Sequence, residues 1–158
     1  MKFSKILVLT AASLGATAAC GGGSSTGGLD AEAVYTFSLT QAAEVPAPKP
    51  STASGSAQMI LYPTSIDYQV NGSSIIGVTA AHIHNGAPGV QGPIVVTLLS
   101  QPAGGTVNGV LARGTLTAAN LPAGVTLDAL KTLILSGNAY INVHTTANPS
   151  GEIRGQIK

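Results

Sequence analysis

Residues 140–145 read Tyr-Ile-Asn-Val-His-Thr, and residues 151–158 read Gly-Glu-Ile-Arg-Gly-Gln-Ile-Lys. In both stretches aliphatic and polar side chains alternate, which is the pattern of a β-strand whose two faces meet different surroundings. The aliphatic side chains share one face, and we expect that face to enter the core. The polar side chains share the opposite face, and we expect that face to point outward.

The same alternation recurs along the rest of the chain, in short runs separated by Gly, Pro and Asn. The further predicted strands are 34–39, 55–62, 65–70, 75–84, 94–99 and 109–117. Residues 121–135 differ, because leucine and isoleucine recur there at helical spacing behind Pro122, and they predict one short helix. Together these elements favour an all-β fold, a Greek-key β-sandwich or flattened barrel.

The composition also favours many short strands joined by tight turns. Of the 158 residues, 44% are hydrophobic, enough for a buried core, while 8% are charged and 4% aromatic. The 20 glycines and 9 prolines suit turns. From Cys20 onward five basic residues stand against six acidic ones, a net charge of −1. Because a nucleic-acid binder needs a basic surface, we exclude nucleic acid as a partner.

The first 19 residues carry a signal for export. Two lysines are followed by a short apolar run and by small residues ahead of Cys20, the only cysteine of the chain. The run is too short to span a membrane, which takes about 20 apolar residues. We therefore interpret residues 1–19 as a lipoprotein signal peptide and Cys20 as the lipidated residue. A plain secretory signal, with an unused thiol at Cys20, is the alternative.

A Gly/Ser-rich stretch follows Cys20 and suits a flexible tether. We expect residues 20–31 to be the lipidated cysteine and tether, and residues 32–158 to form one domain. The predicted partner of the anchor is the membrane, and the predicted location is the cell envelope. Gly21 resembles the signals of outer-membrane or surface lipoproteins rather than those of the inner membrane. Since the one cysteine carries lipid, the domain can form no internal disulfide.

All three histidines of the chain fall on the polar faces of predicted strands. His82 and His84 flank Ile83, and His144 belongs to the stretch 140–145. A His-x-His pair spaces two imidazoles by about 7 Å along one strand face, close enough to share a metal ion with a third ligand. Imidazole suits copper, zinc, nickel and iron. The alternative is that the three rings hydrogen-bond to loops and backbone carbonyls.

Three ordered blocks of the sequence resemble the chordin-domain (CHRD) pattern, over about residues 34–158. The blocks are Leu39-Thr-Gln-Ala-Ala-Glu-Val-Pro46 with Gly55-Ser-Ala57, Ala80-Ala-His-Ile-His-Asn-Gly-Ala-Pro-Gly89 with Gly92-Pro-Ile-Val-Val96, and Tyr140-Ile-Asn-Val-His-Thr145 with Asn148-Pro-Ser-Gly-Glu-Ile-Arg-Gly-Gln156. The resemblance implies an immunoglobulin-like or superoxide-dismutase-like β-sandwich of the kind found in exported bacterial proteins. It implies little about activity, because such folds carry many functions.

A fainter resemblance is to copper–zinc superoxide dismutase. That family also has a His-x-His pair on one strand, a further histidine on a late strand and an arginine near its copper. The matching positions here are His82, His84, His144 and Arg154. The chain departs from the family because it lacks a fourth copper-ligand histidine, a bridging histidine, a zinc-site cluster and a cysteine pair. What remains is a mononuclear copper site, beside which Arg154 would tune charge or guide an anion.

Three functions are compatible with these observations. The leading expectation is a non-enzymatic β-module with a structural or binding role, in which hydrogen bonds of the histidines, Asn142, Glu152 and Arg154 fix the loops. The second is a metal-binding lipoprotein that holds one copper or zinc ion through the three histidines, with the same three residues beside them. The third is a redox enzyme at that copper. No spacing of serines, carboxylates or glycines indicates another enzyme class, and we expect Glu44 to accept backbone N–H groups of its own loop.

Overall fold

A computed structural model describes residues 30–100 and 103–158. The strands are β1 (Ala33–Leu39), β2 (Ser54–Tyr62), β3 (Ser65–Asn85), β4 (Ile94–Leu99), β5 (Ala103–Leu116), β6 (Ala139–Thr145) and β7 (Ile153–Gln156). A 3₁₀ helix, η1 (Gln41–Ala43), follows β1, and one α-helix, α1 (Leu127–Leu135), precedes β6. The predicted signal peptide, Cys20 and most of the tether lie outside the described residues. Within them, no helix is long and apolar enough to cross a membrane.

The predicted all-β class with one short helix is confirmed, but the middle of the chain differs from the prediction. The strands predicted at 65–70 and 75–84 form one continuous strand, β3. Its pairing with β5 shifts register between Val70 and Val78, and within that stretch Ser74 (φ 55°) and Gly77 (φ 66°) have left-handed backbone conformations. Bulges of this kind bend a strand without ending it, so one strand serves two halves of the sheet.

The helix begins later than the leucine spacing predicts, at Leu127 instead of residue 121. Thr126 caps it, because its side chain accepts a hydrogen bond of 3.2 Å from the N–H of Ala129. Leu121 and Val125 still pack against the core, from a loop. Their apolar character therefore reflects burial and not helical structure.

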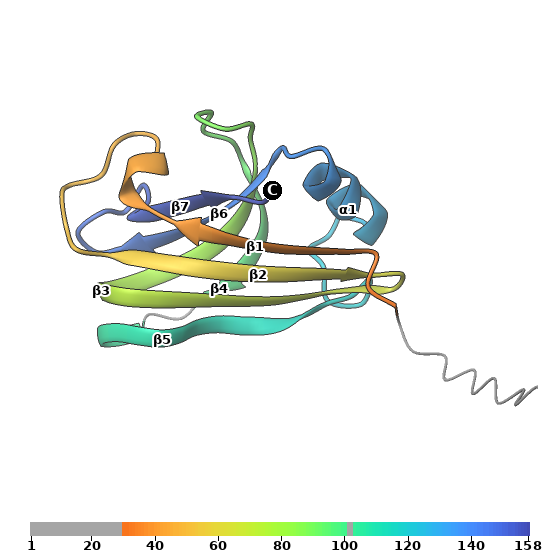
Figure 1. Cartoon of the computed structure of the whole chain (residues 1–158), viewed down its shortest axis with the longest axis horizontal. Helices are drawn as coiled ribbons and strands as arrows, with labels where there is room; N and C mark the ends of the chain where they lie inside the picture. Colours follow the sequence, from red (N-terminus) through yellow and green to blue (C-terminus); the bar gives the residue numbers. More distant parts are fainter. Residues whose placement is uncertain (1–29, 101–102) are drawn as a thin grey trace, which may run out of the picture.

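β3 is the centre of the sheet. Asn71 of β3 pairs with both β2 and β5, and Val78 pairs with both β5 and β6. Consequently β2 and β6 share one edge of β3, while β5 and β4 lie along the other. Because β3 bends, the pairs β2–β1 and β6–β7 curl toward each other. Thr40, just after β1, and Arg154 of β7 exchange backbone hydrogen bonds of 2.9 and 3.0 Å, which closes this side into a flattened barrel (Figure 1).

The aliphatic faces of the strands fill the interior of the barrel, as alternation predicts. Fully buried side chains there include Leu39, Met59, Leu61, Ile66, Val70, Ile83, Ile141, Val143 and Ile153. Helix α1 lies at one end of the barrel (Figure 1) and buries Leu127, Leu130 and Ile134 against the same core. Each such side chain contributes about 1.5–3 kcal/mol by leaving water. In the described part of the chain this core, with the closed sheet, holds the domain together.

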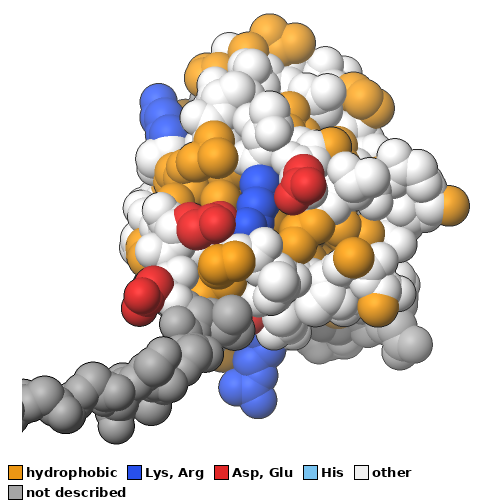
Figure 2. All heavy atoms as spheres, turned by 90° about the vertical axis from the view of Figure 1, so that its right-hand side faces the viewer, with side chains coloured by type: hydrophobic (Ala, Val, Ile, Leu, Met, Phe, Trp, Pro, Cys, Tyr) orange, Lys and Arg blue, Asp and Glu red, His pale blue; other side chains and the backbone are white. Residues whose placement is uncertain are grey.

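A buried lysine ties α1 to the start of the domain. Lys131 Nζ donates to Glu32 Oε2 at 2.6 Å and to the carbonyl oxygen of Pro63 at 3.0 Å. The helix is thereby fixed to the chain ahead of β1 and to the turn between β2 and β3. Figure 2 looks onto this side of the molecule, where acidic side chains lie beside a basic one among hydrophobic groups.

Candidate metal centre

The bend in β3 brings the three histidines together. His82 and His84 lie on the second half of β3, and His144 lies on the neighbouring strand β6. In the antiparallel register His82 pairs with Asn142, and His144 pairs with Ala80, two residues before His82. Residues that pair directly across an antiparallel sheet share a face, so all three imidazoles lie on the side away from the aliphatic core.

The polar face points away from the aliphatic core, as predicted, but it is covered and not exposed to solvent. His84 is 7% exposed, and Asn142 and Arg154 are each 2% exposed, while His82 and His144 are half-buried. The segments between β3 and β4 and between β6 and β7 fold back over the face, and their carbonyls hydrogen-bond the rings. Gly and Pro in these segments set the turns, but alternation alone carries no information about what folds over a strand.

The ring nitrogens of the three histidines converge. One nitrogen from each of His82, His84 and His144 lies within 4.8 Å of the others. The ring centroid of His82 lies 4.8 Å from that of His144 and 5.6 Å from that of His84. Three atoms no more than 4.8 Å apart lie within roughly 2.8 Å of a common point, against about 2.0–2.1 Å for a metal–imidazole bond. Small side-chain movements therefore suffice to close the three rings on one ion.

Two backbone carbonyls orient two of the rings. Nδ1 of His84 lies 2.8 Å from the carbonyl oxygen of Gly92, and Nδ1 of His144 lies 2.9 Å from that of Pro149. A carbonyl only accepts, so each Nδ1 carries the hydrogen and each Nε2 keeps a lone pair. Both Nε2 atoms are buried without a hydrogen-bond partner, as is Nδ1 of His82. Metal-binding histidines are commonly oriented through the other ring nitrogen in this way.

The environment keeps the three imidazoles uncharged. Burial, reinforced by the neighbouring His144 and His84, lowers the pKa of His82 to about 4. Burial also lowers the pKa of His84 and of His144, although the Gly92 and Pro149 carbonyls partly oppose the shift. Neutral imidazole is the form that binds metal ions, so near neutral pH no proton competes at these rings.

Tyr140 lies beside His84 and was not predicted as a site residue. Its ring stacks on that of His84, with centroids 4.8 Å apart and planes 7° apart, and the Arg154 guanidinium carbon lies 3.4 Å from the Tyr140 centroid. Tyr140 stands two residues before Asn142 and four before His144, on the same strand face. The alternation in 140–145 placed it on that face, but no spacing rule predicts a ring stack with the facing strand.

Arg154 and Glu152 hold the covering loops. The Arg154 guanidinium donates to the carbonyls of Val90 and Ala87 at 3.0 Å each, so it fastens the segment between β3 and β4. The Glu152 carboxylate, 4% exposed, accepts hydrogen bonds from four side chains. Its donors are Gln41, Ser51, Thr145 and Asn148. These two residues therefore fix loops around the histidines, as the hydrogen-bond alternative supposed, and neither donates to a histidine ring.

Asn142 and Glu44 are two further buried polar residues of this region. The Asn142 side chain acts on the pKa of both neighbours, raising that of His84 and lowering that of Glu44, against the larger effect of burial. Glu44 Oε1 accepts the N–H of Val45 at 3.2 Å, as predicted for a loop-capping carboxylate. Its Oε2 and the Oδ1 of Asn142 are buried without a partner. The sequence contains no signal that would bring Glu44, distant in the chain, to this place.

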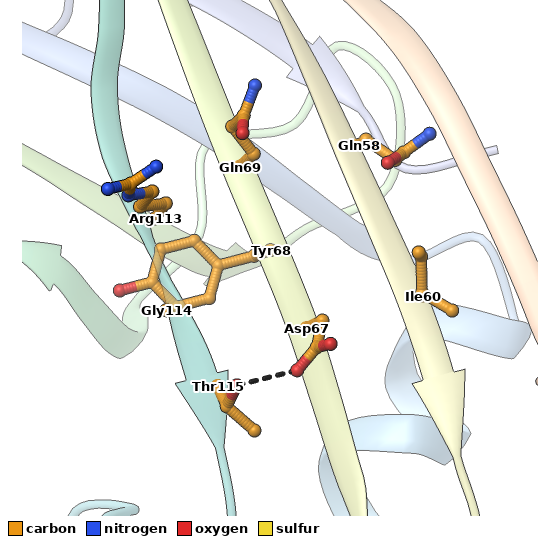
Figure 3. A pocket seen from close by; sticks show the side chains of 8 residues that line it. All are labelled: Gln58, Ile60, Asp67, Tyr68, Gln69, Arg113, Gly114 and Thr115. Carbon is orange, nitrogen blue, oxygen red and sulfur yellow. Dashed lines mark hydrogen bonds between the residues drawn. The ribbon is translucent and has the colours of Figure 1, made fainter. Parts of the chain in front are cut away.

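A hollow lies away from the histidines, over the first half of β3 and the neighbouring strands β2 and β5 (Figure 3), with a volume of about 480 Å³. It is lined by Gln58, Ile60, Asp67, Tyr68, Gln69, Arg113, Gly114 and Thr115. Figure 3 shows the Tyr68 ring lying toward Gly114 and the hydroxyl of Thr115 bonded to Asp67, at 2.6 Å. With one carboxylate and no histidine or cysteine, this hollow offers no set of metal ligands comparable with the three histidines.

The three-histidine cluster lies inside a sequence family that covers the domain. Residues 35–157 match the CHRD domain, and this range includes all three histidines, Glu44, Asn142, Glu152 and Arg154. No curated protein and no solved structure matches the chain. The match spans most of the sequence and the whole closed sheet except the first two residues of β1. The chain belongs to the CHRD domain family.

Proposed function

We propose that this protein is a lipid-anchored module of the cell envelope that binds one transition-metal ion, copper or zinc, through His82, His84 and His144. Two observations carry the proposal: one ring nitrogen from each histidine lies within 4.8 Å of the others, and each ring has one buried nitrogen without a hydrogen-bond partner. If the cluster were purely structural, each buried polar atom should have a hydrogen-bond partner, because leaving one unpaired destabilises the fold by about 1–3 kcal/mol. A metal ion would satisfy all three nitrogens at once.

The donor set favours copper or zinc over harder metals. Three neutral imidazoles suit both ions, whereas calcium and magnesium prefer oxygen ligands. Three protein ligands leave a coordination position for water or for a group supplied by a partner, which suits capture and transfer of the ion. Copper(II) binds nitrogen ligands more tightly than zinc does, so copper is the first ion to test.

The anchor belongs to the same proposal. A lipid on Cys20 followed by the Gly/Ser-rich tether would hold the domain at a membrane surface while leaving the histidine face free to meet a diffusing ion or partner. Mass spectrometry of the membrane fraction should find a diacylated Cys20 at the new N-terminus. A Cys20→Ser chain should leave the membrane fraction. A processed wild-type chain that is soluble and carries no lipid on Cys20 would contradict the anchor.

Metal binding is tested on the full chain carrying Cys20→Ser, so that neither lipid nor thiol contributes. We expect one copper or zinc ion per chain, measured by elemental analysis after dialysis and by competition titration against a chelator of known affinity. A His82→Ala/His84→Ala/His144→Ala variant should lose this binding. Gln58→Ala, on β2 beside the first half of β3, is the matched control and should bind as the parent does.

Two results would contradict the metal function. Equal binding by the triple-histidine variant would place the ion elsewhere in the chain. Absence of binding by a parent chain with a native circular dichroism spectrum would leave the cluster as a device that only fixes loops.

A further inference from the structure

The three histidines of the site are held with unequal firmness. Nδ1 of His84 bonds the Gly92 carbonyl at 2.8 Å, and Nδ1 of His144 bonds the Pro149 carbonyl at 2.9 Å. Among the described residues no hydrogen bond involves either ring nitrogen of His82, and its Nδ1 is buried without a partner. The two segments that cover the site therefore fix His84 and His144 through a carbonyl each, and neither fixes His82 in this way.

Packing adds to this difference. His84 is 7% exposed and lies flat against the Tyr140 ring, with 4.8 Å between the two centroids. His82 is half-buried, so part of its ring reaches solvent, and it meets the rings of His84 and His144 only edge-on or tilted. A side chain with an exposed part and no hydrogen bond changes rotamer more readily than a ring that is fixed on two sides.

His84 and His144 consequently form a fixed pair of donors. Their ring centroids lie 6.1 Å apart, and each ring keeps a buried Nε2 without a hydrogen-bond partner. Because the carbonyls orient both rings before an ion arrives, these two donors lose little conformational freedom on binding. His82, which would bind through its buried Nδ1, has to be ordered by the ion itself. Its bond to the ion is therefore the one most easily broken.

We propose that His82 is the exchangeable ligand of the metal site, which turns outward to admit and to release the ion while His84 and His144 hold it. The inference rests on the proposed metal-binding function. In the release step the bond between the ion and His82 Nδ1 breaks, its electron pair stays on the nitrogen, and an incoming nitrogen donor forms the new bond. The ion keeps its charge, and no electron or proton moves. A partner that takes the ion approaches from the His82 side.

Acylation by diethyl pyrocarbonate tests this in the zinc-loaded full chain carrying Cys20→Ser. The reagent needs a free nitrogen lone pair, so a histidine reacts only while its ring is off the ion. Tandem mass spectrometry measures the rate at each histidine. We expect His82 to react roughly two- to tenfold faster than His84 or His144, the factor that an orienting hydrogen bond contributes. Equal rates, or a faster reaction at His84 or His144, would overturn the proposal. No zinc bound by a folded parent would overturn both the proposal and the metal function.

Two glycine variants test which ligand a free donor can replace. In His82→Gly, added imidazole should enter the space that opens to solvent and restore the retention of zinc against a chelator. In His84→Gly the space is closed to solvent, since His84 is 7% exposed. Imidazole should there change zinc retention no more than in the parent, which is the reference for imidazole that binds elsewhere on the ion.

Rescue of both glycine variants, or of neither, with zinc bound by the parent, would overturn the exchange role of His82 and leave the metal function intact. Circular dichroism checks that each variant is folded. If His84→Gly does not fold, the acylation rates of the parent decide.

Discussion

The imidazole of His84 lies parallel to the phenol ring of Tyr140, with 4.8 Å between centroids and 7° between planes. Because His84 covers one face of the Tyr140 ring, the Arg154 guanidinium, 3.4 Å from its centroid, lies over the other. The stack limits rotation of the His84 ring about its axis, and the Gly92 carbonyl fixes which nitrogen faces the cluster. A ligand oriented before the metal arrives loses less conformational freedom on binding.

Replacing Tyr140 with leucine should weaken metal binding by roughly two- to tenfold, because a stacked ring pair contributes about 0.5–1.5 kcal/mol. Tyr140→Phe keeps the ring and loses only the hydroxyl contacts with Gly92, at 3.2 Å or longer, so it should bind nearly as the parent does. Competition titration of both variants measures the difference. An equal loss of affinity in the two would show that the hydroxyl, and not the stack, matters.

Removing the Arg154 guanidinium should loosen the segment that orients His84. Arg154→Met leaves the carbonyls of Ala87 and Val90 without donors, and we expect the free energy of unfolding to fall by about 2–4 kcal/mol. Urea denaturation measures this loss. Lys158→Met, at an exposed position just beyond the same strand, is the control and should change stability by less than about 0.5 kcal/mol. Similar stability of the two variants would contradict the loop-fastening role.

Gly92 should tolerate no side chain, whereas another glycine of the same loop should. A Cβ at Gly92 would lie 1.6 Å from the carbonyl oxygen of Asn85, so Gly92→Ala must displace the carbonyl that holds His84. We expect a strong loss of both thermal stability and metal affinity. At Gly89 an added Cβ meets nothing within 4 Å, and only the positive φ of 76° causes strain. Gly89→Ala should therefore cost about 1 kcal/mol and leave metal affinity unchanged.

The metal-free protein should lose stability in mild acid. The pKa of His82 is about 4 in the folded state and 6.5 in the unfolded reference, so the unfolded state binds more protons between these values. The contribution of His82 is complete above about pH 6.5 and is lost as the pH falls toward 4. Thermal unfolding of His82→Gln against the parent should show a shallower loss in this window, by roughly 1–2 kcal/mol after allowance for partial exposure.

The contribution of Glu44 to stability changes with pH in the opposite direction to that of His82, so the two contributions can be measured separately. Burial raises the pKa of Glu44 from the usual 4.5 to about 7, so its contribution is complete below about pH 4.5 and is lost as the pH rises through 7. The Glu44→Gln variant should therefore gain stability over the parent as the pH rises, by roughly 2 kcal/mol at pH 8. A constant difference between parent and variant from pH 4.5 to 8 would contradict a buried, protonated Glu44.

Alternation in the sequence was sufficient for the fold class and for the faces of the strands. Period-2 patterns predicted the all-β domain, and they placed Tyr140, Asn142 and His144 together on the face away from Ile141 and Val143. This succeeds because side-chain direction in a strand follows from local backbone geometry alone. The helix start was less well predicted, because the burial of Leu121 gives the same apolar signal as a helical position.

Only the tertiary structure decided what surrounds the histidines. The bend in β3 places β6 beside His82 and His84, and that bend depends on bulges that no residue pattern specified. The burial of the polar face comes from loops that Arg154 and Glu152 hold from other strands. Glu44 packs against Gly151 across about 100 positions of the sequence. Such contacts arise from the closure of the whole sheet, a non-local event, whereas the sequence by itself records which face each side chain takes.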